Sequence, residues 1–154
     1  MSLLGSPLEA SLRALVALDV MHPKAHSLDE LMVFDHVCMH SLDFGGPESL
    51  HPALPLRAAD LGARRAQVRA GVELLAHRGL ATVDVTRAAI LVGPGRDSSV
   101  VVRSLRSSYL RGYEARAQWL RSSQILGSRE QAEALLKTIV SSWSLNNGTA
   151  DDEY

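Results

Sequence analysis

The sequence predicts a mainly α-helical protein with a small β-hairpin, organised as a winged helix-turn-helix-like domain with additional C-terminal helices. Helical segments with their own start or stop signals fill most of the chain before residue 79. Two short strand-like runs follow, and apolar residues recur at helical spacing again from residue 98 onward. Three helices followed by a hairpin are the element order of a winged helix.

Two capping boxes define the first two helices. Ser6 and Pro7 are suited to the N-cap and the first helical position, and the first helix should end before Pro23. Ser27 is followed three residues later by Glu30, which predicts the start of a second helix that frays near residue 41. The chain therefore begins with two helices joined by a short turn.

A long amphipathic helix is predicted over residues 57–78, and a hairpin follows it directly. The apolar face of this helix consists of Leu61, Val68, Val72 and Leu75. Gly79 is suited to the position just past the helix end, because glycine adopts a positive φ without strain. Residues 80–85 and 88–92 have the composition of strands, with a tight connection at residues 86–87.

The rest of the chain is predicted to be helical. One helix should run from residue 98 or 99 to residue 124, with Gly112 as a weak point, and another should begin after Ser128. The last helix carries an apolar stripe made by Ala132, Leu135, Leu136, Ile139, Val140 and Trp143. This stripe either packs back on the preceding helix or binds a partner.

These predictions divide the chain into three parts. Residues 1–95 form the winged-helix-like domain with an inserted loop over residues 41–57, residues 96–145 form a C-terminal helical extension packed on it, and residues 146–154 form an acidic disordered tail. The single cysteine, Cys38, excludes an intramolecular disulfide. The chain opens without the features of a secretory signal, and no apolar run approaches the ~20 residues of a membrane span, so we expect a soluble cytoplasmic protein.

Residues 41–57, SLDFGGPESLHPALPLR, form a loop that is rich in turn formers and yet apolar. A disordered linker is usually less apolar than this, and long loops in compact domains are often functional. We therefore expect the loop and the last helix to contact partners. The candidate partner-binding residues are Phe44, Leu50, His51, Leu54, Leu56, Leu136, Ile139, Val140 and Trp143.

Charge is distributed unevenly along the chain, although the formal net charge is only −1. Residues 1–56 hold two basic and seven acidic residues, residues 57–121 hold twelve arginines and five acidic residues, and residues 122–154 hold two basic and five acidic residues. A cationic middle between anionic ends is typical of a surface that meets nucleic acid or an acidic partner. Guanidinium groups suit bidentate contacts to phosphate or carboxylate.

The arginines of the predicted winged helix are candidates for DNA contact. Arg65 and Arg69 share one flank of the long helix, and Arg64 lies on the other. Arg87 is placed at the tip of the hairpin. Because Gln67 is the only side-chain amide available on this helix for adenine, we expect non-specific phosphate contact or an acidic protein partner rather than sequence readout.

A metal site is the main catalytic alternative. His36 and His40 stand four residues apart on a predicted helix, so that their imidazoles can converge on one ion with His51 or Asp35. No H-E-x-x-H motif, Cys-x-x-Cys pair, phosphate-binding loop or G-x-S-x-G motif accompanies them. We therefore expect helix-edge histidines, and no catalytic residue, metal or cofactor.

Three segments of the chain resemble sequences of a known family: SPLEASLRALVALD at residues 6–19, HSLDFGGPESLHPALPLR at 40–57 and LLAHRGLATV at 74–83. With them, roughly residues 6–124 resemble the middle component of bacterial ABC-three-component systems, the Lamassu-type antiphage defence operons. The resemblance implies an adaptor without catalytic activity, docked on an SMC-like ATPase subunit and linked to an effector subunit. It supplies no catalytic residues.

Two functional hypotheses follow. The first is an adaptor subunit of an SMC-like ATPase defence complex that also touches double-stranded DNA without sequence preference. The second is a free-standing winged-helix transcriptional regulator, which would form a homodimer with a preferred duplex site. An enzyme is the third class, and replacing His36 and His40 by alanine would test it.

Overall fold

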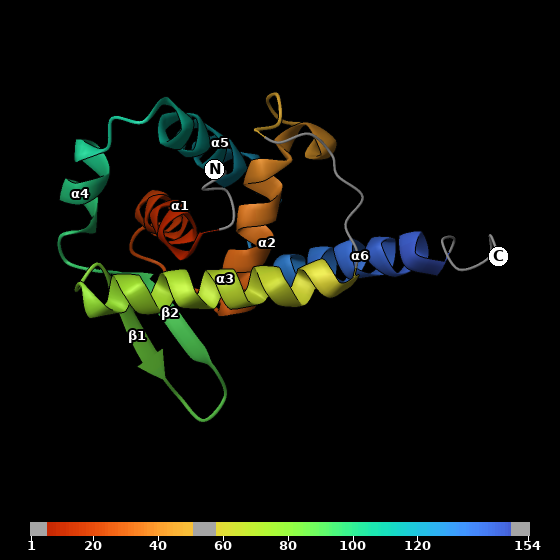
Figure 1. Cartoon of the computed structure of the whole chain (residues 1–154), viewed down its shortest axis with the longest axis horizontal. Coiled ribbons are helices and arrows are strands. Elements are labelled where there is room, and N and C mark those ends of the chain that lie inside the picture. The colour runs from red at the N-terminus through yellow and green to blue at the C-terminus, as the bar shows by residue number, and fades with distance from the viewer. Residues whose placement is uncertain (1–5, 51–57, 149–154) are drawn as a thin grey trace.

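The computed structural model describes the backbone of residues 6–50 and 58–148, with side chains except those of residues 58–61, 140 and 142–148. The elements are α1 Pro7–Val20, α2 Leu28–Met39, the 3₁₀ helix η2 Ser41–Phe44, α3 Ala58–His77, β1 Ala81–Val85, β2 Ile90–Pro94, α4 Ser98–Ser104, α5 Ser108–Ser123 and α6 Arg129–Gly148 (Figure 1). The predicted fold class, mainly helical with one small hairpin, is confirmed.

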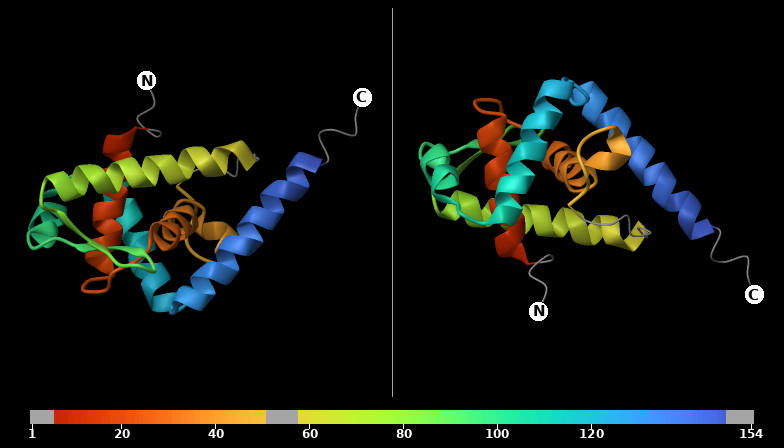
Figure 2. Two further views of the ribbon diagram at one scale, coloured as in Figure 1. Left: turned by 90° about the horizontal axis from the view of Figure 1, so that it is seen from below. Right: turned by 90° about the horizontal axis from the view of Figure 1, so that it is seen from above.

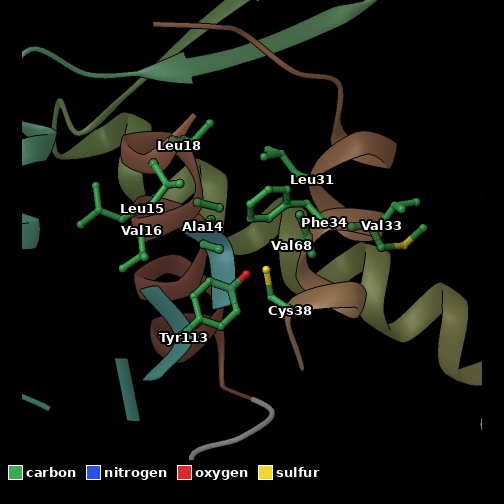
Figure 3. Packing of buried hydrophobic residues seen from close by; sticks show 14 of the residues in the cluster. Ala14, Leu15, Val16, Leu18, Leu31, Val33, Phe34, Cys38, Val68 and Tyr113 are labelled. Atoms are coloured by element: carbon green, nitrogen blue, oxygen red, sulfur yellow. The ribbon is translucent and has the colours of Figure 1, made fainter. Parts of the chain in front are cut away.

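Helix α1 lies at the centre of the protein and is buried on nearly all sides. It packs on α2, α3, α4 and α5, which surround it in the views of Figures 1 and 2. Leu15 and Leu18 have no exposed surface. Figure 3 shows Phe34 from α2, Val68 from α3 and Tyr113 from α5 packed around it. The core is therefore a helical layer built on one central helix.

Helix α3 approaches α1 closely because a glycine stands at the contact. A Cβ atom on Gly71 would lie 2.8 Å from the backbone nitrogen of Ser11 and 3.0 Å from the carbonyl carbon of Ala10. Any larger residue would push the two helices apart, since backbone atoms cannot move aside as a side chain can. Gly71 thus sets the spacing between the two helices.

The predicted helix ends are confirmed where they depend on local capping. Ser6 and Ser27 accept hydrogen bonds from the backbone N–H groups of Glu9 and Glu30, at 3.2 and 3.1 Å. At the end of α3, Gly79 has a φ of +69°, and the N–H of Leu80 donates to the carbonyl of Leu75 at 2.9 Å. This is a Schellman ending.

The hairpin β1–β2 is antiparallel, with Val83 opposite Val92. The outer edge of β2 pairs in turn with His26, whose backbone exchanges two hydrogen bonds of 2.7 Å with Val92. This pairing fixes the hairpin to the start of α2 and leaves β1 as the outer strand. The second strand begins at residue 90 rather than 88, because Thr86 holds a longer turn by accepting hydrogen bonds from the N–H groups of Ala88 and Ala89. The hairpin projects from the helical body (Figure 1).

The single helix predicted up to residue 124 is wrong. The chain forms α4 and α5 with a break at residues 105–107, whereas Gly112, the expected weak point, lies inside α5. Leu105 has an extended backbone, and Ser107 begins a new helix by accepting a hydrogen bond from the N–H of Leu110 at 3.4 Å. The break turns α5 back over α1, where Tyr113 is buried.

Helix α6 begins with a capping box in which Ser128 and Gln131 exchange hydrogen bonds of 3.1 and 3.2 Å. It extends to Gly148, three residues into the segment expected as a tail. Its contacts are made with α2 and α3 (Figure 2). Within residues 6–50 and 58–148, no helix is both long and apolar enough to span a lipid bilayer.

We predict that Gly71→Ala lowers the free energy of unfolding by about 1–3 kcal/mol, because the added methyl group collides with the backbone of α1. Gly62→Ala in the same helix is the matched control. A Cβ atom there meets nothing within 4 Å among the described residues, so helix propensity should raise stability by up to about 1 kcal/mol. Denaturant unfolding measures both, and a stabilised Gly71→Ala variant would contradict the close approach.

Candidate functional site

A charged cluster is buried where α1, α2 and α5 meet. The Nε of Arg13 donates to Oδ1 of Asp35 at 2.9 Å, and its Nη1 donates to Oε1 of Glu9 at 3.0 Å. The hydroxyl of Tyr113 donates to the same Asp35 oxygen at 2.8 Å. Arg13 and Asp35 are only 5 % and 7 % exposed. Their side chains thus satisfy one another inside the protein.

This cluster joins three helices through hydrogen bonds between polar and charged side chains. Burial, followed by the neighbouring Asp35 carboxylate, raises the pKa of Tyr113 well above its ordinary value, so the phenol stays protonated and donates. Asp35, which the sequence suggested as a metal ligand, is instead bound to Arg13 and Tyr113. No sequence pattern indicates this pairing, since its members lie far apart along the chain, in α1, α2 and α5.

His36 in α2 and His40 at its C-cap are both buried, which corrects the expectation of exposed helix-edge histidines. His36 is 9 % and His40 6 % exposed, with ring centroids 4.8 Å apart. Phe44 stands edge-on to His36 at 6.0 Å. Burial, and then the nearby Arg64 and His40, lower the pKa of His36 to about 3. Among the described residues, no group of three or more His, Cys, Asp or Glu side chains could hold a metal ion.

The described part of the 41–57 stretch folds back on the protein. The Oγ of Ser41 donates to the carbonyl of Pro47 at 2.8 Å, and the N–H of Leu50 donates to the carbonyl of Met39 at 3.1 Å. Arg116 of α5 donates to the carbonyl of Glu48. Phe44 and Leu50 pack against the core, whereas His51, Leu54 and Leu56 lie outside the described residues.

The predicted contact residues of α6 face the body of the protein where the structure describes them. Ile139 is buried, and Leu136 is half-buried against the core. The side chains of Val140 and Trp143 lie outside the described part. In this structure the apolar stripe of α6 is therefore used, at least over its first half, to hold α6 on α2 and α3.

Two of the four arginines expected to meet DNA have ion-pair partners within the protein. Arg65 pairs with Asp29 at 2.8 Å, and Arg69 pairs with Glu73 at 3.2 Å. Arg64 is half-buried, and its buried Nη1 has no hydrogen-bond partner among the described residues. Arg87 is exposed in the hairpin turn. The arrangement does not bring the four guanidinium groups together on one open face.

Asp29 also lines a cleft of about 300 Å³ between the start of α2, the hairpin turn and α6. The neighbouring Glu30 accepts hydrogen bonds from Nδ1 of His26 at 3.0 Å and from Nε of Arg129 at 2.9 Å. Burial opposes ionisation of Glu30, but these two donors outweigh it and lower its pKa. Glu30 thereby joins the base of the hairpin to the first turn of α6.

Sequence reasoning missed the apolar strip of the hairpin. Val83, Val85 and Ile90 lie on one face of the two strands and are 44 %, 71 % and 47 % exposed. The alternation of Ala81, Val83 and Val85 was the available signal, because side chains two residues apart share a face. Buried Ala81 and Val92 show that the strip starts at the core and continues beyond it.

We predict that Asp35→Ala lowers the free energy of unfolding by about 3–5 kcal/mol, because it leaves the Arg13 charge buried without its main partner. Tyr113→Phe removes one hydrogen bond to the same carboxylate and should cost about 1–3 kcal/mol. Denaturant unfolding measures both losses. If Asp35→Ala lowers the free energy of unfolding less than Tyr113→Phe does, the ion pair does not hold the three helices together.

We predict that the protein loses stability in acid partly through His36. The pKa of His36 is about 3 when folded and 6.5 when unfolded, so the unfolded chain binds the extra proton between these values. Stability therefore falls as the pH drops below about 6.5, by about 1.4 kcal/mol per pH unit for this residue.

His36→Gln should reduce the loss of stability between pH 7 and pH 5 by about 2 kcal/mol. His77→Gln, at an exposed residue in the last turn of α3, is the control and should leave the loss unchanged. Urea unfolding at the two pH values measures the difference, and an equal pH dependence in all three proteins would contradict the prediction.

A comparison with protein families matches residues 3–146 to the model described as ABC-three component (ABC-3C) system Middle Component 2. Searches of the curated proteins and of the solved structures found no significant match. The matched span covers almost the whole chain, and the description implies partner subunits. The chain therefore belongs to the ABC-three component system Middle Component 2 family.

Proposed function

We propose that this protein is an adaptor without catalytic activity in a Lamassu-type antiphage defence complex. It would dock on an SMC-like ATPase subunit, link that subunit to an effector, and touch double-stranded DNA without reading its sequence. The observation that carries the proposal is family membership over residues 3–146, because a middle component of a three-component system works with other subunits.

The exposed hairpin supports the adaptor role, because it offers a surface on which a partner can dock. Its strip of Val83, Val85 and Ile90 is exposed at the end of an element that projects from the body (Figure 1). The outer edge of β1 has no paired strand among the described residues. An exposed apolar face beside a free strand edge is suited to a partner's extended segment, which would supply both backbone hydrogen bonds and apolar side chains.

The alternative, a free-standing transcriptional regulator, needs α3 to enter a DNA groove. The geometry disfavours this mode, because α6 packs against α3 and the guanidinium groups of Arg65 and Arg69 are paired with Asp29 and Glu73. Entry would require these contacts to open first. The adaptor needs no such rearrangement.

The proposal is tested by expressing the tagged protein with the genes beside it and measuring the assembly by size exclusion and mass photometry. We expect a stable complex with a large ATPase. Val85→Asp combined with Ile90→Asp should reduce recovery of the partner roughly tenfold or more, because a buried carboxylate at an apolar contact is unfavourable. The fold should persist, since both side chains are largely exposed.

Leu8→Asp is the matched control, because Leu8 is 56 % exposed but lies in the first turn of α1, away from the hairpin. It should leave recovery unchanged. The adaptor role is wrong if ATPase and effector assemble and restrict phage equally well without this protein. If the hairpin double variant and Leu8→Asp recover the partner equally well, the docking surface is not the hairpin. Leu42 in η2, which is 60 % exposed, is then the next residue to change.

A further inference from the structure

Unpaired arginines gather at one end of the protein, away from the first half of α3. Between residues 78 and 111 the chain holds six arginines and only two acidic residues. All six are exposed, and none of their guanidinium groups forms a hydrogen bond or ion pair with another described residue. They are Arg78, Arg87, Arg96, Arg103, Arg106 and Arg111. Five of them, all except Arg87 in the hairpin turn, form what we name the basic end.

The fold brings the segments of the basic end together. The N–H of Gly95 donates to the carbonyl of Leu80 at 3.0 Å. Arg96 directly follows Gly95 and Arg78 lies two residues before Leu80, so the two arginines lie on adjoining stretches of backbone. Arg103 lies in the last turn of α4. Figure 1 shows α4 and the C-terminal end of α3 at the same end of the protein.

The two remaining arginines lie at the start of α5. Arg106 immediately precedes the N-cap Ser107, and Arg111 follows in the second turn. The first turn of α5 holds no acidic residue, so the positive end of the helix adds to the two guanidinium charges. The basic end therefore extends over four successive segments of the chain.

Several arginines elsewhere in the protein have internal partners, in contrast to those of the basic end. Arg65 and Arg69 pair with carboxylates, and Arg116 and Arg121 donate to the carbonyls of Glu48 and Val20. Those guanidinium groups serve the fold. The guanidinium groups of the basic end make no contact that the structure describes, and five like charges in one region cost stability through repulsion unless a partner offsets them.

We propose that the basic end binds the phosphate backbone of double-stranded DNA without reading sequence. This inference rests on the DNA contact of the proposed function and assigns it to residues other than Arg64, Arg65, Arg69 and Arg87. Arginine forms bidentate contacts with phosphate. Residues 78–111 contain no Asn or Gln, so the side chains that read adenine are missing there.

An acidic protein surface fits the basic end less well than DNA does. Protein interfaces usually have an apolar centre. Among the described residues of α4 and the adjoining connections, Val100 is the only large apolar side chain that is strongly exposed, whereas the hairpin strip offers three. Exposed hydroxyl groups of Ser104, Ser107 and Ser108 accompany the arginines, as is common in phosphate contacts.

The test compares two triple variants of the purified protein for binding to a short random-sequence duplex by fluorescence anisotropy. The first is Arg103→Gln, Arg106→Gln, Arg111→Gln. The second, Arg65→Gln, Arg69→Gln, Arg87→Gln, removes the same charge from the face that the sequence suggested. Circular dichroism tests whether each variant is folded. A third variant, Arg103→Lys, Arg106→Lys, Arg111→Lys, keeps the positive charge and so separates the loss of charge from a local disturbance caused by the substitutions.

We expect the wild-type protein to bind more weakly as salt rises from about 50 to 200 mM. The first variant should lose at least about tenfold in affinity, and its log–log salt slope should fall by about one per phosphate contact removed. The second variant should bind within about twofold of the wild type, and the lysine variant should retain most of the affinity.

Three outcomes would overturn the inference. Absence of DNA binding by the wild type would do so while leaving the adaptor role intact, because co-purification tests that role separately. An equal or larger loss in the second variant would return the contact to α3. Unchanged DNA binding together with loss of the hetero-complex in the first variant would assign the basic end to an acidic partner protein.

Discussion

The buried ion pair between Arg13 and Asp35 is the interaction on which the rest of the structure depends. Because α1 is surrounded by other helices, any polar side chain on it must find its partner inside the protein. Arg13 donates a hydrogen bond to the Asp35 carboxylate in α2, and the hydroxyl of Tyr113 in α5 donates to the same carboxylate. The pair therefore fixes the rotation of three helices about their axes, a task that apolar packing alone performs less specifically.

This rigid centre separates two surfaces that differ in chemistry. The hairpin is held at its base by pairing with His26 and presents an apolar strip farther out. The basic end presents arginines along α4 and the start of α5. Glu30, between His26 and Arg129, ties the base of the hairpin to α6. Because the two surfaces are separate, an adaptor could bind a protein partner and DNA at the same time.

Local signals predicted much of the fold. The caps at Ser6, Ser27 and Ser128 and the glycine at residue 79 act within a few residues, so their effect on helix ends is visible in the sequence. The break before α5 was missed because the favoured N-cap at Ser107 competes with a continuous apolar pattern, and only packing on α1 decides between them. The burial of α1 on all sides likewise depends on neighbours distant in sequence.

The pairing of the candidate arginines could not be predicted from the sequence, for the same reason. Whether an arginine is open or paired depends on carboxylates brought near by folding, as Asp29 is brought to Arg65 from 36 residues away. The expectation placed DNA contact on α3 from fold analogy alone. The apolar hairpin strip was visible as alternating valines, but alternation cannot tell whether the outer part of a strand is covered.

Hydrogen–deuterium exchange of this protein, alone and assembled with the ATPase and effector subunits, tests the docking surface most directly. The adaptor account predicts that assembly slows exchange in the backbone amides of β1, Ala81–Val85, while α4 stays unchanged until DNA is added. If assembly slows exchange over the first half of α3 and leaves exchange in β1 unchanged, the adaptor account is contradicted.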